Sequence, residues 1–103
     1  MARVIITTPA DADTADILAD LCGEAGQVIA EKYNSRFESL YDRLADHPDG
    51  YPRRPKLGLH IRIGLVLPYV VIYRHVEGDD TVSVIRVVHG RRRLTRKLLQ
   101  GKL

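Results

Sequence analysis

Cysteine is almost absent from the chain, since Cys22 is the only one among 103 residues. A lone cysteine cannot form an internal disulfide. It also cannot build a structural zinc site, which needs several thiolate or imidazole ligands. The sequence therefore indicates a protein of a reducing compartment.

Long hydrophobic runs are also missing near the start of the chain. The segment "MARVIITTPA" (1–10) has one charge and only a short apolar run, which is too little for a signal peptide or a transmembrane helix. We therefore expect a cytoplasmic protein with no membrane partner.

Groupings that bind metals or activate nucleophiles are missing as well. The four histidines are well separated and fall in no ligand spacing. The carboxylates of the C-terminal half all lie in one predicted turn, whereas a metal-dependent nuclease needs carboxylates from several places. The sequence also has no glycine-rich phosphate loop and no serine in a nucleophile elbow. We expect no metal and no other cofactor.

Positive charge is scarce in the first half of the chain and abundant in the second. Residues 1–49 hold four basic against ten acidic residues, a net charge of −6, whereas residues 50–103 hold twelve against three, a net charge of +9. The composition, 45% hydrophobic and 28% charged, fits one globular domain over 1–103. The split indicates that the C-terminal half contacts a polyanion or an acidic protein. A merely solvated basic face is the simpler alternative.

The first residues predict a strand followed by a helix. "RVIITT" (3–8) contains a β-branched apolar run, which is typical of a short strand. The following pattern predicts a helix over 9–22 that begins with Thr8 as cap and Pro9 in its first turn. Gly23 is placed to end this helix.

A second helix is expected after a connection over 23–26. Its apolar residues recur at steps of three and four (Ile29, Tyr33, Phe37, Leu40 and Leu44). Pro48 disfavours helix beyond the residue before it. A break at Asn34 is the alternative, but the apolar stripe passes through that position in phase.

The second half predicts three strands and a short last helix. The strands are expected over 60–66, 69–76 and 81–89, after a proline-rich basic loop over 51–58. "EGDD" is a hairpin turn, and Leu67-Pro68 is another turn without the usual Gly or Asn. Thr95 is a good cap for a helix over about 96–100.

This order of elements predicts an α+β fold. An antiparallel helical hairpin would pack on one face of a four-stranded sheet, which an N-terminal strand and a three-stranded antiparallel meander form together. The opposite sheet face would be open. Alternation groups Ile61, Ile63 and Leu65 on one face of their strand. In the last strand it groups four residues on one face and leaves the core side undecided (Val82, Val84, Arg86 and Val88).

Three consecutive arginines follow Gly90 in "VVHGRRRLTRK" (87–97). At the start of a helix they would place positive charge on its positive end, which costs stability. Guanidinium groups suit phosphate or carboxylate recognition. We therefore interpret this segment as a docking patch.

Metal-free RNA cleavage is the enzymatic alternative. It needs a proton-transferring group near the 2′-hydroxyl and cations that stabilise the developing charge. The candidates are three arginines and three ring side chains (Arg62, Arg74, Arg86, Tyr69, Tyr73 and His89). Strand alternation places His89 and Arg86 on opposite faces, so a structural histidine bonded to the chain is the favoured interpretation.

Three segments resemble the ParE/RelE superfamily of type II toxin–antitoxin toxins: "TTPADADTADILADL" (7–21), "DRLADHP" (42–48) and "YVVIYRHVEGDDTVSVIRVVHGRRRL" (69–94). The resemblance covers nearly the whole chain in order and spacing. The ending "VIRVVHGRRRL" (84–94) is most similar to the ParE branch. That branch implies a non-enzymatic inhibitor of DNA gyrase that blocks replication, whereas the RelE branch implies a ribosome-dependent mRNA endoribonuclease.

The resemblance also implies partners and site residues. The expected partner is a ParD-like antitoxin whose acidic, amphipathic C-terminal segment wraps around the toxin in a hetero-oligomeric complex. We expect gyrase to contact the C-terminal cations (Arg91, Arg92, Arg93, Arg96 and Lys97). We expect the antitoxin to contact five arginines (Arg53, Arg54, Arg62, Arg74 and Arg86).

Two alternatives to a gyrase inhibitor stay open at this point. A ribonuclease would use four residues (Arg62, Tyr73, Arg86 and His89), although the last strand lacks the terminal tyrosine common in such nucleases. A DNA-binding module fits the charge, but the sequence shows no recognition helix with base-contacting polar residues.

Overall fold

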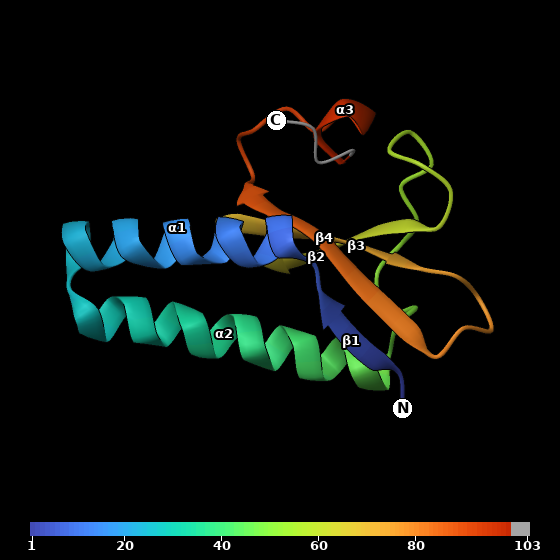
Figure 1. The fold of residues 1–103 in the computed structure, drawn as a ribbon, viewed down its shortest axis with the longest axis horizontal. Coiled ribbons are helices and arrows are strands. Elements are labelled where there is room, and N and C mark those ends of the chain that lie inside the picture. The colour runs from blue at the N-terminus through green and yellow to red at the C-terminus, as the bar shows by residue number, and fades with distance from the viewer. Residues whose placement is uncertain (100–103) are drawn as a thin grey trace.

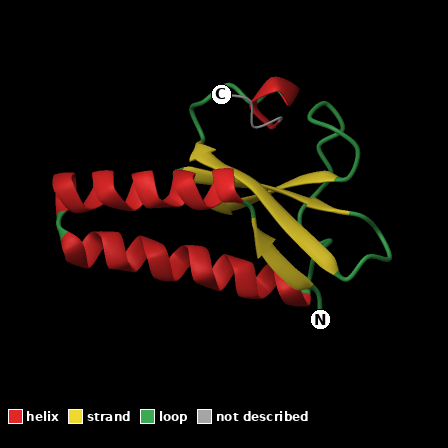
Figure 2. Cartoon of the chain, viewed as in Figure 1, coloured by secondary structure: helices red, strands yellow, loops and turns green. Residues whose placement is uncertain are grey.

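The structure, a computed structural model, describes residues 1–99, which form a helical hairpin, a mixed sheet and a short last helix (Figure 1, Figure 2). The elements are β1 (Arg3–Ile6), α1 (Thr8–Ala25), α2 (Gln27–Asp46), β2 (Ile61–Val66), β3 (Tyr69–His75), β4 (Thr81–His89) and α3 (Arg96–Leu99). The strands pair in the order β1-β4-β3-β2, with β1 parallel to β4 and the other pairs antiparallel. The predicted α+β fold is confirmed.

The turn between α1 and α2 differs from the prediction, because Gly23 lies inside α1 and does not end it. Gly26, with a φ of 94°, is the only residue between the two helices. A positive φ favours glycine, which has no Cβ to clash with the backbone. The predicted cap is also wrong: Thr8 is already helical, and the Thr7 hydroxyl before it donates to the Val84 carbonyl at 2.7 Å.

The second helix, α2, is continuous, so the alternative break at Asn34 is wrong. Its buried stripe has the predicted period (Ala30, Phe37, Leu40 and Leu44). The helix ends where the His47 N–H donates to the Arg43 carbonyl, just before Pro48. No helix within residues 1–99 is long and apolar enough to cross a membrane.

Two apolar clusters lie on the two faces of the sheet, so the expectation of an open face is wrong. The larger cluster fills the space between the helical hairpin and the sheet (Ala10, Phe37, Leu40, Leu44, Val66, Val71, Tyr73, Val82, Val84 and Val87). The smaller one lies on the face turned away from α1 and α2, here called the far face (Leu57, Ile61, Ile63, Val70, Ile72 and Val88). Leu94, Leu98 and Leu99 pack against it and cover it.

In β2 the two sets of alternating residues divide between these faces. Ile61 and Ile63 are buried on the far face, and Leu65, opposite Val70, shares that face as predicted but is 46% exposed. Gly64 faces α2, where an added Cβ would lie 3.2 Å from the methyl groups of Leu40. The missing side chain therefore lets α2 pack close to the strand.

A β-bulge in β4 corrects the predicted grouping of its residues. The register between β3 and β4 shifts between Val84 and Arg86, so that Ile85 has no partner residue in β3. Val84 consequently packs toward the hairpin, whereas Val88 belongs to the far face. The four residues predicted to share one face are thus divided between two.

β1 ends at Ile6, two residues before its predicted end, since α1 already begins at Thr8. The boundaries of the other three strands follow the prediction within one residue. β2 begins at Ile61 because His60 has a φ of 68°, outside the strand region. Leu67 and Pro68 form the first hairpin turn, as expected. The last helix begins at Arg96, and Gln100, its expected last residue, lies outside the described residues.

Candidate functional site

The chain leaves β4 in a tight turn at the end of the sheet. The Gly90 N–H donates to the Pro68 carbonyl at 2.8 Å, and the Arg92 N–H donates to the His89 carbonyl at 2.9 Å. A Cβ on Gly90 would lie 3.1 Å from the same Pro68 oxygen, closer than nearly all real contacts of a Cβ. This turn directs the three arginines after Gly90 away from the sheet.

The last helix is held by a cap and by its leucines. The Leu98 N–H lies 3.3 Å from the Thr95 hydroxyl, as predicted for a capping residue. Three leucines of this segment pack on the far face (Leu94, Leu98 and Leu99). The leucines are half-buried and the polar residues between them are exposed, so packing of the leucines leaves the cations facing solvent.

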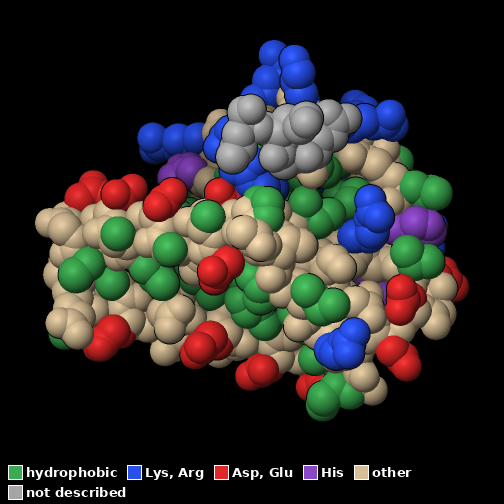
Figure 3. Space-filling model, in the orientation of Figure 1, with side chains coloured by type: hydrophobic (Ala, Val, Ile, Leu, Met, Phe, Trp, Pro, Cys, Tyr) green, Lys and Arg blue, Asp and Glu red, His purple; other side chains and the backbone are tan. Residues whose placement is uncertain are grey.

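These cations form part of a larger basic surface with the loop before β2. We define the basic surface by its members (Arg53, Arg54, Lys56, Arg74, Arg91, Arg92, Arg93, Arg96 and Lys97), all of them exposed. One hollow links the loop cations to Leu94, and another is lined by both Arg74 and Arg96. Figure 3 shows Lys and Arg gathered above the sheet, whereas Asp and Glu follow the two long helices.

The basic surface is poorly neutralised by the rest of the molecule. Within residues 1–99, Arg53 is its only member in an ion pair, with Nη2 2.9 Å from the Glu77 carboxylate. Both side chains are at least half exposed, and exposed pairs contribute about 0–1 kcal/mol. Arg92 lines a hollow with acidic residues of α1 (Asp13, Asp16, Asp20 and Glu24) but forms no ion pair with them within residues 1–99. The surface can therefore attract an anionic partner.

Arg86 lies in an internal ion pair. Its Nε and Nη2 atoms donate to the two Asp13 oxygens at 2.7 and 2.9 Å, and its Nη1 donates to the Leu98 carbonyl at 3.2 Å. The hydrogen bond to Asp13 raises the pKa of the guanidinium. Asp13 also accepts from the Val87 N–H at 2.9 Å. Arg86 thus joins α1, β4 and the last helix.

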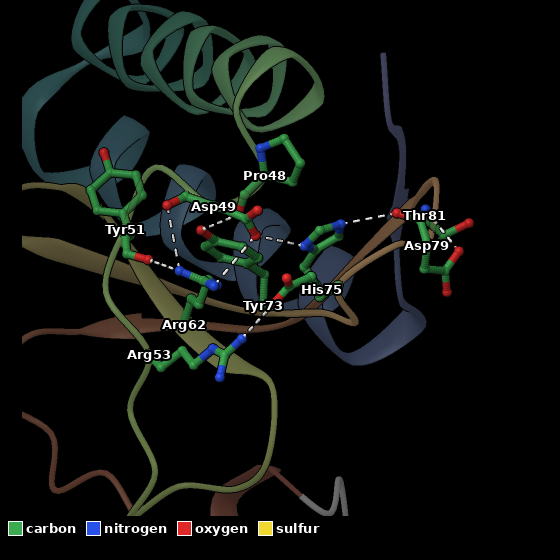
Figure 4. A network of polar contacts seen from close by, with 10 residues as sticks. Pro48, Asp49, Tyr51, Arg53, Arg62, Tyr73, His75, Asp79 and Thr81 are labelled. Carbon is green, nitrogen blue, oxygen red and sulfur yellow. Dashed lines mark hydrogen bonds and ion pairs between the residues drawn. The ribbon is translucent and has the colours of Figure 1, made fainter.

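Arg62 lies in a second internal network, at the end of α2 (Figure 4). It is 8% exposed, and its Nη2 lies 3.3 Å from the Asp49 carboxylate, while Nη1 donates to the Tyr51 carbonyl. His75 contacts the same Asp49 oxygen through Nδ1 at 2.9 Å, and its Nε2 contacts the Asp79 carbonyl at 2.9 Å. The network fastens the loop after α2 to β2 and β3.

Tyr73 belongs to the same region and is fully buried. Its hydroxyl donates to the Pro48 carbonyl at 3.0 Å. Burial is the main cause that raises the pKa of this hydroxyl to about 12, against the smaller opposing effect of Arg62. A proton held this firmly, away from solvent, is badly placed for proton transfer.

The residues expected for RNA cleavage are therefore dispersed. Arg62 and Tyr73 lie in the buried network, Arg86 is paired with Asp13, and His89 is exposed at the end of β4. The Nδ1 atom of His89 accepts the Arg91 N–H at 3.0 Å, and its ring stands edge-on to Tyr69. These contacts are of the kind expected for a histidine bonded to the chain.

Residues 1–99 contain no group of three or more His, Cys, Asp or Glu side chains placed to hold a metal ion.

Sequence reasoning missed both internal ion pairs. Asp13 and Arg86 are 73 residues apart in the sequence, and Asp49 lies in the loop after α2, 13 residues before Arg62. The available signal is indirect: an arginine on a strand that is otherwise buried needs a carboxylate partner. The sequence offers ten carboxylates in its first half, and only the folded chain selects Asp13 and Asp49.

Comparisons with known proteins agree with this fold. A family model described as the ParE toxin of a type II toxin–antitoxin system, parDE, matches residues 4–94. Toxin ParE3 of Caulobacter vibrioides is 34% identical over 98 residues, which cover 95% of this chain and 96% of that protein. A chain of the solved chromosomal ParDE system from P. aeruginosa superposes with a TM-score of 0.70 at 20% identity, over 86% of this chain and 96% of that one.

Proposed function

Because the chain belongs to the ParE toxin family of type II toxin–antitoxin systems, we propose that it inhibits DNA gyrase, and so replication, by binding gyrase through its basic surface. The observation that carries this proposal is the exposed run Arg91–Arg93, which forms no ion pair within residues 1–99. Guanidinium groups in this state are available to carboxylates of a protein partner.

Inhibition by binding rather than by cleavage is supported by the placement of the nuclease candidates. Arg62 and Arg86 have their guanidinium groups in internal ion pairs, and the Tyr73 hydroxyl is bonded to a backbone carbonyl. Ribosome-dependent cleavage would need these groups around one phosphate. No such cluster supports that alternative among the described residues.

We also propose that a ParD-like antitoxin neutralises this toxin in the cytoplasm, by direct binding in a hetero-oligomeric complex. Of the five arginines expected to contact it, Arg53, Arg54 and Arg74 are exposed and available. The other two are the internally paired arginines described above. The proposal therefore keeps the three exposed arginines as antitoxin contacts.

The test replaces Arg91, Arg92 and Arg93 together by Ala. Each charge-assisted hydrogen bond contributes about 1.5–3 kcal/mol, so the concentration that half-inhibits supercoiling by purified gyrase should rise at least about a hundredfold. Growth arrest on induction should disappear, while the circular dichroism spectrum and the melting temperature stay those of the unaltered chain.

The matched control removes the same number of exposed cations elsewhere, with Arg3, Lys32 and Arg36 replaced by Ala. This variant should inhibit gyrase as the unaltered chain does, because the basic surface is intact. Full inhibition by a folded Arg91–Arg93 variant would overturn the proposal. Cleaved mRNA with uninhibited gyrase would replace it with the ribosomal alternative.

A further inference from the structure

A row of cations runs along α2, inside the otherwise acidic half of the chain. Lys32, Arg36 and Arg43 are three of the four basic residues of 1–49, and steps of four and seven place them on one helix face. All three are exposed, and within residues 1–99 none forms an ion pair. Arg36 lies over the Tyr33 ring at 4.8 Å, and Arg43 is in the last turn of α2, where a cation favours the helix. Like charges at Lys32 and Arg36, four residues apart, nevertheless destabilise a helix, so folding does not explain that pair.

The row borders a hollow between α2 and β2. The hollow has a volume of about 310 Å³, and its lining combines the three cations with two serines and part of β2 (Ser35, Ser39, Leu65 and Val66). Leu65 is 46% exposed, and Leu67, just beyond β2, is 62% exposed. We call this hollow and the adjoining strand edge the α2–β2 groove.

The backbone of β2 has unused hydrogen-bonding groups along this groove. β2 is an edge strand, and the Arg54 N–H donates to the Ile61 carbonyl on the side away from β3. Backbone groups of an antiparallel strand alternate in direction, so those of Ile63 and Leu65 point to the same outer side. The antiparallel bridge between Arg53 and Arg62 places the preceding loop beside the first half of β2, including the Ile63 N–H. The free part of the edge therefore lies at Leu65, whose backbone makes no bond outside the sheet within residues 1–99. An extended peptide can add there as a further strand.

We propose that the α2–β2 groove accepts an extended, acidic segment of the antitoxin as a fifth strand beside β2. The inference rests on the proposed function, since it takes the antitoxin as the occupant. Alternate side chains of an added strand point to opposite faces. Acidic residues at every second position would meet Lys32, Arg36 and Arg43, and apolar residues between them would pack against Leu65.

Charge selects this occupant over a second copy of the chain. Pairing of two β2 edges would bring two rows of unpaired cations together, and like charges in juxtaposition oppose association. Cations also protect edge strands from aggregation. An acidic strand can hydrogen-bond to the outer edge of β2 and also neutralise the three cations of α2.

The experiment uses the full chain with the antitoxin produced from the neighbouring gene. The first measurement is amide hydrogen exchange, which should slow at Leu65 when the antitoxin binds. The second measurement is the dissociation constant of the complex between the antitoxin and the double variant Lys32→Glu and Arg36→Glu. It should be at least about tenfold higher than that of the unaltered chain. Gyrase inhibition by this variant should be unchanged.

Arg3→Glu is the control, because it reverses a charge on β1, at the opposite edge of the sheet, and should bind the antitoxin normally. The neutral double variant Lys32→Gln and Arg36→Gln should bind the antitoxin more weakly than the unaltered chain but more tightly than the Glu variant. It replaces the Glu variant in the test if that variant misfolds. Unchanged antitoxin affinity of a folded double variant, or unslowed exchange at Leu65, would overturn this inference alone. An unaltered chain that binds no antitoxin would instead overturn the proposed neutralisation.

Discussion

Asp13 shows how one carboxylate can organise several elements. β1 has four residues and β4 has nine, so the end of β4 extends beyond its parallel partner. Asp13, from α1, accepts the Val87 N–H there and also holds the Arg86 guanidinium with both oxygens. The side chains of this ion pair are 12% and 17% exposed, so solvent screens them weakly.

Replacing Asp13 by Ala should lower the free energy of unfolding by about 3 kcal/mol. The change leaves Arg86 without its counter-ion and the Val87 N–H without its acceptor. Urea unfolding followed by circular dichroism measures the loss. Asp16→Ala is the control: Asp16 is exposed on the same helix, and its removal should change stability by less than about 0.5 kcal/mol. Equal stability of the two variants would contradict the role given to Asp13.

At the scale of elements, the two glycines near the end of α1 have opposite roles although both precede α2. Gly23 is inside a continuous helix, where glycine costs conformational entropy and a Cβ would meet nothing within 4 Å. Gly26 has φ 94° and ψ 166°, a backbone region that is essentially restricted to glycine. The sequence favours Gly23 as the terminator because the apolar spacing stops there.

Gly23→Ala should raise the free energy of unfolding by about 0.5–1 kcal/mol, whereas Gly26→Ala should lower it by about 1–3 kcal/mol. The melting temperatures should move in opposite directions, by about 4–8 °C for each kcal/mol in a domain of this size. Because each variant adds one methyl group three residues from the other, the pair is internally controlled. A stabilised Gly26→Ala chain would mean that the helices are joined differently.

At the scale of the whole molecule, three tyrosines make the free energy of unfolding depend on pH in the alkaline range. Burial is the main cause that raises the pKa values of Tyr41, Tyr69 and Tyr73, and it raises that of Tyr73 to about 12. A raised pKa means that the folded state keeps its proton while the unfolded chain, near pH 10, loses it. The contribution is therefore complete below pH 10 and is lost as the pH rises toward 12.

Because Tyr73 loses its proton in the unfolded chain first, it should lower the free energy of unfolding by about 1.4 kcal/mol for each pH unit between 10 and 12. The measurement compares the urea concentration at the unfolding midpoint for the unaltered chain and for Tyr73→Phe at several pH values from 8 to 12. Tyr73→Phe should be less stable at pH 8, because it lacks the hydrogen bond to the Pro48 carbonyl, and the difference should shrink as the pH rises. A difference that is constant with pH would contradict the buried, protonated hydroxyl.

Most of the fold was predictable from the sequence, because local patterns determine it. The period of α2, the proline at its end and the alternation in β2 each specify an element. The bulge at Ile85 and the cover over the far face were not predictable, since both arise from packing between distant segments. Within the candidate site, the exposed run Arg91–Arg93 was predictable from its conflict with helix polarity. The row on α2 has a visible spacing, but its position beside a free strand edge requires the structure.

The parallel pairing of β1 with β4 has a consequence for how the chain emerges from the ribosome. Arg3 is opposite Thr81, so the first strand has no partner until the last one has been synthesised. At about 5–20 residues per second, the N-terminal strand waits for several seconds while the helices and the first hairpin can already form. The cations after β4 are made later still. A nascent chain therefore completes its sheet and presents Arg91–Arg93 only at the close of translation.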